Sequence, residues 1–304
     1  MKVTPESKRL LEAFIEKHQL DTNFSDVALT WFIPLAEKLK LHHDSAERPI
    51  FIGINGCQGS GKSTLTELLL TYLTEVKQLK VINLSLDDFY FSKAYRHELA
   101  DSIHPLLATR GVPGTHDTKL LNQVLLNLKQ QQTGFAIPRF NKATDDPFPK
   151  EEWPVIEQPV DIILMEGWCW GVTAQTNEQL STPINTLESE EDSDGTWRTY
   201  VNQQLQTEYQ NLYQLMDFWI MLKAPSFECV FDWRLQQEQK LIQKLATASD
   251  SEAKSGIMSV NEIKRFIQHY QRLTEQSLAT LKDSCDVVFD LDKHRKIINV
   301  KGVK

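Results

Sequence analysis

The sequence predicts an α/β fold in which a central, mostly parallel sheet is covered by helices. Two observations carry this prediction. Short apolar runs, each long enough for one buried strand, alternate with longer segments whose apolar residues recur at helical spacing. The first run leads into a glycine-rich loop and then a helical pattern, as in a strand–loop–helix unit. The expected strands cover residues 50–54, 81–86, 160–165, 217–222 and 287–291, and the last of these is expected to be the final strand of the chain.

The glycine-rich loop from Gly53 to Thr64 reads G-I-N-G-C-Q-G-S-G-K-S-T and contains the pattern G-x-x-x-x-G-K-S. Glycines let a backbone approach a bulky anion, and successive N–H groups of such a loop form an anion-binding nest. The helix that starts near Lys62 adds unpaired amides and the positive end of its dipole. Lys62 can reach the β- and γ-phosphates, and the Ser63 hydroxyl can ligate Mg²⁺. The sequence therefore predicts the three-layer sandwich of P-loop NTPases, with nucleotide-binding residues Gly56, Cys57, Gln58, Gly59, Ser60, Gly61, Lys62, Ser63 and Thr64.

Composition limits the classes of partner. The 304 residues are 41% apolar and 24% charged, as in an ordinary globular protein with a large core. The formal net charge of −8 and the pI of about 5.6 disfavour duplex nucleic acid and anionic membranes as partners, but not a small anionic substrate. No apolar run is long enough to span a membrane and no signal-peptide pattern begins the chain, so we expect a cytoplasmic protein.

The four cysteines are scattered, without a C-x-x-C pair or zinc-ligand spacing. Free thiols in a reducing cytosol are therefore expected. Cys57, inside the phosphate loop, is interpreted as a small residue that fits there. The alternative is a reactive thiol, because an anion-binding site is electropositive.

The chain divides into an N-terminal helical segment over residues 1–48 and a P-loop domain over residues 49–304. The N-terminal segment carries apolar residues on helical stripes, with Pro34 starting or kinking its second helix. We expect these helices to pack on the outside of the sheet.

Two stretches are expected to be irregular. Residues 171–197 look the least ordered, and their acidic run, 188–194, is typical of a solvated surface loop. Residues 247–257 are expected to form a flexible linker. A capping box of Ser259 and Glu262 then predicts the start of another helix.

Acidic residues follow two of the expected strands. Asp87 and Asp88 come at the end of the second strand, and Glu166 ends the third. Ligands of parallel α/β sheets bind at the carboxyl ends of strands, so Asp87 is a candidate general base or Mg²⁺ ligand. Asp88 is expected to point the other way, and the alternative for either acid is to cap the next helix. Glu166 is expected to hold Mg²⁺ or its waters opposite Ser63, unless it only meets solvent.

Two further segments contain candidate binding residues. The turn-rich loop 104–117 contains Arg110 and His116, which a rigid backbone could hold toward a ligand, although a lone loop histidine is more often a surface or capping residue. A helix is expected to start at Pro225 and to contain Arg234. This arginine could reach the phosphates as a lid residue, or it could be an ordinary exposed helix arginine.

The order of these segments resembles the D-glycerate 3-kinase family. This family belongs to a wider group of P-loop kinases with uridine kinase, phosphoribulokinase and bacterial pantothenate kinase. The resemblance covers most of residues 48–292 and implies an ATP- and Mg²⁺-dependent kinase domain over 49–304 that acts on a small hydroxy acid. It rests on the phosphate loop, S-L-D-D-F-Y, R-G-V-P-G-T-H-D, P-R-F-N-K, E-G-W and D-W-R-L-Q-Q-E. It also implies that Trp197 and Arg198 belong to an ordered element rather than to a linker.

The resemblance also implies a role for each matching residue. Asp87 matches the acid that takes the proton of the acceptor hydroxyl, with Mg²⁺ coordination as its other candidate role. Glu166 matches the acid near Mg²⁺, Arg234 matches the lid arginine, and Lys62 holds the triphosphate. The residues implied to lie near the acceptor are Tyr90, Arg110, His116 and Lys142, of which Arg110 and Lys142 suit a carboxylate.

The chain departs from the family pattern at one position. Pro147 stands where relatives often carry an arginine, and Arg139 is a basic residue that could substitute for it. This departure keeps other acceptors open: a nucleoside, pantothenate or a sugar phosphate. A P-loop ATPase that acts as a regulatory or assembly protein is the alternative of a different class. Its GTPase version is disfavoured because N-K-A-T at Asn141 lacks the final acid of N-K-x-D. The sequence does not indicate an oligomeric state.

Overall fold

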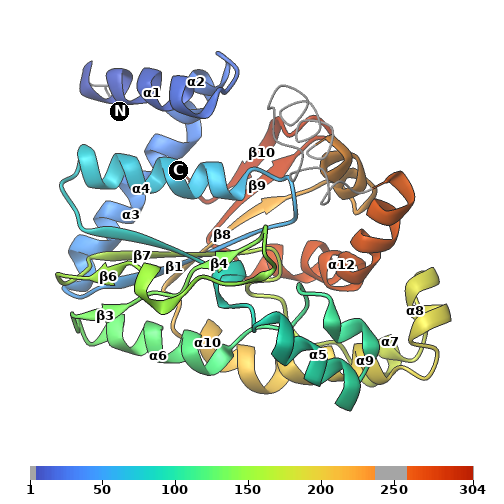
Figure 1. The fold of residues 1–304 in the computed structure, drawn as a ribbon. Coiled ribbons are helices and arrows are strands. Elements are labelled where there is room, and N and C mark those ends of the chain that lie inside the picture. The colour runs from blue at the N-terminus through green and yellow to red at the C-terminus, as the bar shows by residue number, and fades with distance from the viewer. Residues whose placement is uncertain (1–4, 237–258, 304) are drawn as a thin grey trace, which may run out of the picture.

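A six-stranded sheet in the strand order β10-β9-β8-β1-β7-β2 forms the centre of the protein (Figure 1). The computed structural model describes residues 5–236 and 259–303. Five strands are parallel, and β10 runs antiparallel to β9, which confirms the expected mostly parallel sheet. The strands are β1 (Ile50–Gly56), β2 (Val81–Ser85), β7 (Ile162–Gly167), β8 (Phe218–Lys223), β9 (Val287–Leu291) and β10 (Ile297–Lys301).

The expectation that the strand at 287–291 is the last was wrong. β10 follows it after a short turn and pairs with β9 at the edge of the sheet. None of the five residues of β10 is fully buried, as expected at the edge of a sheet. Their sequence, I-I-N-V-K, also lacks the continuous apolar run that marks a central strand. An edge strand of this kind gives a weaker sequence signal than a buried one.

Helices cover both faces of the sheet. Alternate residues of β1 point to opposite cores: Ile50, Ile52 and Ile54 join one core, and Phe51 joins the other. The first core contains the N-terminal helices α1 (Pro5–His18), α2 (Phe24–Val27) and α3 (Ile33–Ala46), with α4 (Lys62–Glu75); the second contains α6 (Thr118–Lys129), α9 (Thr196–Gln204) and α10 (Gln210–Tyr213) (Figure 1).

The long helix α12 (Val260–Thr280) contributes to both cores. Ile263 and Ile267 pack in the first, and Tyr270 and Leu273 pack in the second. Its capping box is present as expected, because the Ser259 hydroxyl accepts from the Glu262 amide while the Glu262 carboxylate accepts from the Ser259 amide. No helix in the described ranges is long and apolar enough to cross a membrane.

Shorter elements connect these layers. A helix begins at residue 228, three residues after Pro225, and continues to residue 236; the expected linker 247–257 lies outside the described residues. Two short antiparallel pairs join β3 (Phe135–Ala136) with β6 (Val155–Ile156) and β4 (Phe140–Asn141) with β5 (Asp146–Pro147), and the second pair is a hairpin. Further α-helices are α5 (Lys93–Ser102), α7 (Asn177–Leu180) and α8 (Thr186–Glu191). Two π-helical turns are present, η1 (Ala28–Phe32) and η5 (Leu205–Tyr209). The described 3-10 turns are η2 (Leu86–Phe89), η3 (Pro105–Ala108), η4 (Lys150–Glu152) and η7 (Leu281–Asp283).

The segment 171–197 is more ordered than its composition suggested. It contains α7 and α8, and two acids of the run at 188–194 are buried. The Glu188 carboxylate accepts from Arg272 Nε at 2.7 Å and Nη2 at 2.6 Å. Asp192 accepts from the Trp197 and Arg198 amides and pairs with the Arg198 guanidinium at 2.8 Å. The solvated-loop interpretation was therefore wrong for these two acids, because arginines neutralise them inside the fold.

Removal of the Glu188 carboxylate tests this arrangement. Glu188→Ala leaves the buried Arg272 guanidinium without its anion, so the free energy of unfolding should fall by about 3–5 kcal/mol in urea denaturation. The matched control is Glu190→Ala, an exposed acid of the same run, which should change it by less than about 0.5 kcal/mol. Equal small effects of the two substitutions would contradict the burial of Glu188.

Candidate active site

The register of the sheet brings three strand ends together. Glu166 lies opposite Ile54 of β1 and opposite Ser85 of β2. The phosphate loop follows β1 directly, and Asp87 follows β2 by two residues. Residues that are distant in sequence therefore meet at the carboxyl edge of the sheet, where parallel α/β folds bind ligands.

The phosphate loop has the backbone that its glycines predict. Gly59 and Gly61 adopt positive φ angles of 78° and 93°, which L-residues rarely do. Gly61 is the N-cap of α4, so the first amides of this helix point into the loop. A Cβ at Gly59 would lie 2.7 Å from Cβ of Trp233, so the loop packs closely on the helix that begins at residue 228.

Lys62 and Ser63, the first residues of α4, both contact Glu166. Lys62 Nζ lies 3.4 Å from Glu166 Oε2, and the Ser63 hydroxyl donates to Glu166 Oε1 at 3.4 Å. Burial alone would lower the pKa of Lys62, but the carboxylates of Glu166 and Asp87 outweigh it and raise that pKa. The ammonium group therefore stays charged although its side chain is partly buried.

The donor set of Ser63 and Glu166 fits Mg²⁺. The Glu166 carboxylate is buried, and its Oε2 accepts no hydrogen bond from the described part of the chain. Within the described ranges, no group of three or more His, Cys, Asp or Glu side chains could hold a metal by itself. Mg²⁺ often uses one or two protein oxygens and completes its octahedron with water and phosphate oxygens, so two ligands at this place suffice.

Asp87 lies in the 3-10 turn η2 after β2 and has two side-chain partners. The Tyr90 hydroxyl donates to its Oδ1 at 3.0 Å, and Lys142 Nζ lies 2.5 Å from its Oδ2. Burial raises the pKa of Asp87, but the positive charges of Lys142 and Lys62 outweigh it and bring that pKa to about 2. Asp87 is therefore ionised across the physiological range.

Asp88 points away from Asp87. It accepts from Arg139 Nη1 at 3.1 Å and from the Phe140 amide at 3.2 Å. Burial raises the pKa of Asp88. The two neighbours diverge as expected, although in a 3-10 turn rather than an extended chain. Neither of them caps α5, whose N-cap is Ser92.

Tyr90 and His116 lie side by side because their segments pair like a short antiparallel ladder. The Phe91 amide donates to the Thr115 carbonyl at 3.0 Å, and the Asp117 amide donates to the Phe89 carbonyl at 2.7 Å. The rings of Tyr90 and His116 stack with their centroids 4.4 Å apart. His116 is 1% exposed, and burial lowers its pKa to about 3.

His116 is thus neither a surface residue nor a helix cap, the alternatives that the sequence left open. Asp117, not His116, caps α6 by accepting from the Leu120 amide. Cys57 also has a clear environment: burial raises the pKa of its thiol to about 12. Because only the thiolate is nucleophilic, the reactive-thiol interpretation of Cys57 is not supported.

Arg110 is held by a contact that the sequence did not suggest. Its guanidinium pairs with Asp145, which also pairs with Arg96 at 2.8 Å. Arg96 is fully buried and donates to the Asp145 carbonyl as well. Two arginines therefore anchor the β4–β5 hairpin, and the turn of this hairpin carries Lys142 to Asp87.

Tyr270 lies near three of the predicted site residues, Asp87, Arg110 and Arg234. Its hydroxyl donates to the Arg110 carbonyl at 3.2 Å. Burial and the charge of Asp87 raise the pKa of Tyr270, whereas Arg110 and Arg234 lower it. Arg234 is partly buried, with its guanidinium 6.0 Å from the Phe266 ring centroid. The exposed-arginine alternative therefore does not describe Arg234.

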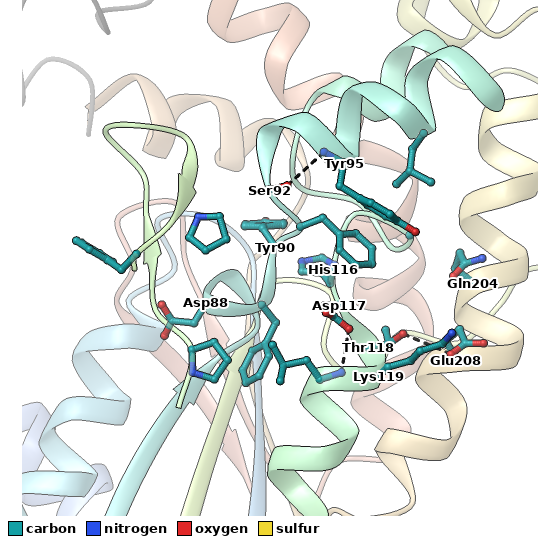
Figure 2. Close-up of a pocket in the computed structure, with 18 of the residues that line it drawn as sticks. Asp88, Tyr90, Ser92, Tyr95, His116, Asp117, Thr118, Lys119, Gln204 and Glu208 are labelled. Atoms are coloured by element: carbon teal, nitrogen blue, oxygen red, sulfur yellow. Dashed lines mark hydrogen bonds between the residues drawn. The ribbon is translucent and has the colours of Figure 1, made fainter. Parts of the chain in front are cut away.

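A cavity of about 870 Å³ borders this cluster (Figure 2). Tyr90 and His116 line it, and Asp88 rather than Asp87 is on its wall. Figure 2 shows Asp88 on one side of Tyr90 and His116 and the pair Gln204 and Glu208 on the other. Tyr90 therefore faces the cavity and also reaches Asp87 through its hydroxyl.

Sequence reasoning missed Arg295, which lies in the turn between β9 and β10. Its Nε donates to the Gly59 carbonyl at 2.6 Å, and its guanidinium lies 5.0 Å from the Trp233 ring centroid. Arg295 has a positive φ of 65°, which is uncommon outside glycine. No local pattern marks it, because its two partners are distant in sequence.

The chain is similar to several known proteins. The model of the KAP family P-loop domain matches residues 34–217. The uncharacterized kinase mug58 of Schizosaccharomyces pombe is 33% identical over 244 residues, which cover 78% of this chain and 83% of that protein. The chloroplastic D-glycerate 3-kinase of Arabidopsis thaliana is 29% identical over 264 residues, which cover 82% of this chain but 53% of that protein, so the match spans about half of this relative.

A solved structure has the same architecture. The D-glycerate 3-kinase from Cryptococcus neoformans var. grubii matches with a TM-score of 0.66 and 26% identity, covering 84% of this chain and 89% of that one. These similarities indicate an ATP-dependent phosphotransferase with an alcohol acceptor. The chain therefore belongs to the KAP family of P-loop domains and to the P-loop kinases that include D-glycerate 3-kinase.

Proposed function

We propose that this protein transfers the γ-phosphoryl group of ATP to the primary hydroxyl of D-glycerate, which gives 3-phosphoglycerate. The observation that carries the proposal is the environment of Asp87, a partly buried ionised carboxylate between Lys62 of the phosphate loop and Lys142 of the β4–β5 hairpin. The names of the Arabidopsis and Cryptococcus relatives support D-glycerate as the acceptor.

In this proposal the phosphate loop holds the donor. The amides at the start of α4 and the Lys62 ammonium bind the triphosphate. Ser63 and Glu166 hold Mg²⁺, which when bound neutralises charge on the phosphate oxygens. Arg234 acts from its helix as the lid arginine, and its positive charge stabilises the transferring phosphoryl group.

The acceptor binds next to Asp87, which orients its hydroxyl and accepts the proton. Phosphoryl transfer depends mostly on positioning and electrostatics, so a strongly basic carboxylate is not required. A carboxylate acceptor offers Lys142 a second anion, and a lysine drawn toward it would let the pKa of Asp87 rise. The substrate thus makes its own base stronger. Tyr90 and His116, which line the cavity, form the rest of the proposed acceptor-binding site.

Pro147 does not supply the cation that relatives often carry at its position, so a substrate carboxylate needs another one. Pro147 is part of β5 and pairs with Phe140, and Arg139 is engaged by Asp88. Arg110 and Lys142 are the cations that we assign to the substrate carboxylate. Both hold internal carboxylates in this structure, Asp145 and Asp87, which an acceptor anion can replace as partners.

The acceptor is tested by initial rates of ATP consumption with D-glycerate, uridine, pantothenate or no addition. We expect D-glycerate to give the highest kcat/KM and the acceptor-free reaction to be negligible. A higher kcat/KM for uridine or pantothenate would reassign the acceptor. Full ATP consumption without any acceptor would support an ATPase of the regulatory class.

Substitution of the proposed base tests the role of Asp87. Asp87→Asn should lower kcat by roughly 10²–10⁴-fold with little change in ATP affinity, because the amide cannot accept the hydroxyl proton. Asp88→Asn is the matched control and should change kcat by less than about tenfold, since Asp88 faces Arg139. Near-normal turnover by Asp87→Asn would sink the assignment.

Substitution of two lysines separates the donor from the acceptor. Lys62→Ala should abolish ATP binding in calorimetry, because the triphosphate loses its partly buried cation. Lys142→Ala should leave ATP affinity unchanged and raise the KM of the acceptor by about tenfold or more. Unchanged ATP affinity in Lys62→Ala would count against the phosphate-loop assignment.

A further inference from the structure

Among the residues that the structure describes, one ring nitrogen of His116 has a hydrogen-bond partner and the other has none. Nδ1 lies 2.6 Å from the Tyr209 hydroxyl oxygen. Nε2 is buried and has no hydrogen-bond partner in the described part of the chain. Buried polar atoms are nearly always satisfied in proteins, so Nε2 is a place where a water or a ligand atom would bind.

The Tyr209 hydroxyl determines which nitrogen of His116 carries the hydrogen. Burial lowers the pKa of His116 to about 3, so the ring is neutral and has one N–H group. Tyr209 is fully buried, and burial raises the pKa of its hydroxyl far above the usual value, so the hydroxyl keeps its hydrogen. Among the described residues, Nδ1 of His116 is the one acceptor that hydrogen-bonds to the Tyr209 hydroxyl, so the hydroxyl hydrogen has no other acceptor there and points at Nδ1. Nδ1 is then the acceptor, and Nε2 carries the ring hydrogen.

The local helix geometry at Tyr209 is unusual. Tyr209 is the last residue of the π-helical turn η5, which interrupts the helical stretch between α9 and α10. A π turn inserts an extra residue, which changes the direction of the side chains around it, and such turns occur often at functional sites. One turn later, the Tyr213 hydroxyl donates to the Cys169 carbonyl at 3.3 Å instead. Two buried tyrosines of one helical stretch thus have different partners.

His116 belongs to the same cluster as Asp87. Tyr90 stacks on its ring and donates through its hydroxyl to Asp87 Oδ1 at 3.0 Å. The negative charge of Asp87 also acts on the His116 ring. His116, which also lines the cavity, therefore belongs to the group of side chains around the proposed acceptor.

We propose that Tyr209 is a positioning residue that holds His116 as the Nε2–H tautomer, and that Nε2 donates a hydrogen bond to an oxygen of the acceptor beside Asp87. The class of ligand is a small hydroxy acid, whose carboxylate and hydroxyl oxygens both accept. The inference rests on the proposed function for the identity of the acceptor. The tautomer itself does not depend on which acceptor is phosphorylated.

The tautomer is measured by ¹⁵N NMR of the imidazole rings in the full chain, with His116→Asn to assign the signals. Wild type should show an N–H shift at Nε2 and a lone-pair shift at Nδ1 of His116. Tyr209→Phe should move the two shifts toward each other, because the ring loses the donor that fixes its tautomer. Tyr213→Phe removes a buried hydroxyl of the same kind and should leave the His116 shifts unchanged. Shifts in Tyr209→Phe equal to those of wild type would overturn the proposal.

Kinetics test the second half, with the acceptor that wild type phosphorylates most efficiently. Tyr209→Phe should raise the KM of that acceptor by about 3–10-fold, the effect of one neutral hydrogen bond, and leave the KM of ATP unchanged. In His116→Gln the amide supplies an N–H without help from Tyr209, so adding Tyr209→Phe should raise KM by less than about twofold.

An acceptor KM that Tyr209→Phe leaves unchanged, or that it raises equally in the His116→Gln background, would contradict a role through His116. An equal rise in Tyr213→Phe would indicate a general effect of the lost hydroxyl and would also contradict the proposal. If D-glycerate is not the preferred acceptor, the proposed substrate fails, but the NMR and KM comparisons still decide the role of Tyr209.

Discussion

The parallel register of β1, β7 and β2 is the constraint on which the site depends. Glu166 is opposite Ile54 on one side and Ser85 on the other, so the ends of three strands are level. The phosphate loop, Glu166 and Asp87 then meet although they are far apart in the sequence. A shift of one residue would turn each side chain to the opposite face of the sheet. The two cores on either side fix this register, because alternate strand residues fill different cores.

The charged side chains at this edge of the sheet alternate between lysines and carboxylates. Lys62 is partly buried and lies between Glu166 and Asp87, and Asp87 lies between Lys62 and Lys142. The β4–β5 hairpin supplies Lys142 and is itself anchored by the pairing of Asp145 with two arginines. Each carboxylate at the acceptor side thus has a cation that a substrate anion can compete for. This property is one ground on which we propose an acidic acceptor rather than a neutral one.

Local patterns in the sequence predicted most of the donor half. The glycine loop and the strand-end acids Asp87 and Glu166 are each encoded within a few residues, and the structure brings them together. The roles of these residues remain proposals. Long-range pairing was not predictable in this way: Glu188 and Arg272 are 84 positions apart, and His116 and Tyr209 are 93 apart. The edge strand β10 was missed because its half-exposed residues lack a continuous apolar run.

The position of the phosphate in the product tests the central claim most directly. D-Glycerate labelled with ¹³C at C3 is incubated with ATP, Mg²⁺ and the enzyme, and the product is followed by ¹³C and ³¹P NMR. The account predicts a phosphorus coupling at C3 with wild type and none with Asp87→Asn over the same time. Phosphate at another position, or no phosphorylated glycerate from wild type while ATP is consumed, would contradict it.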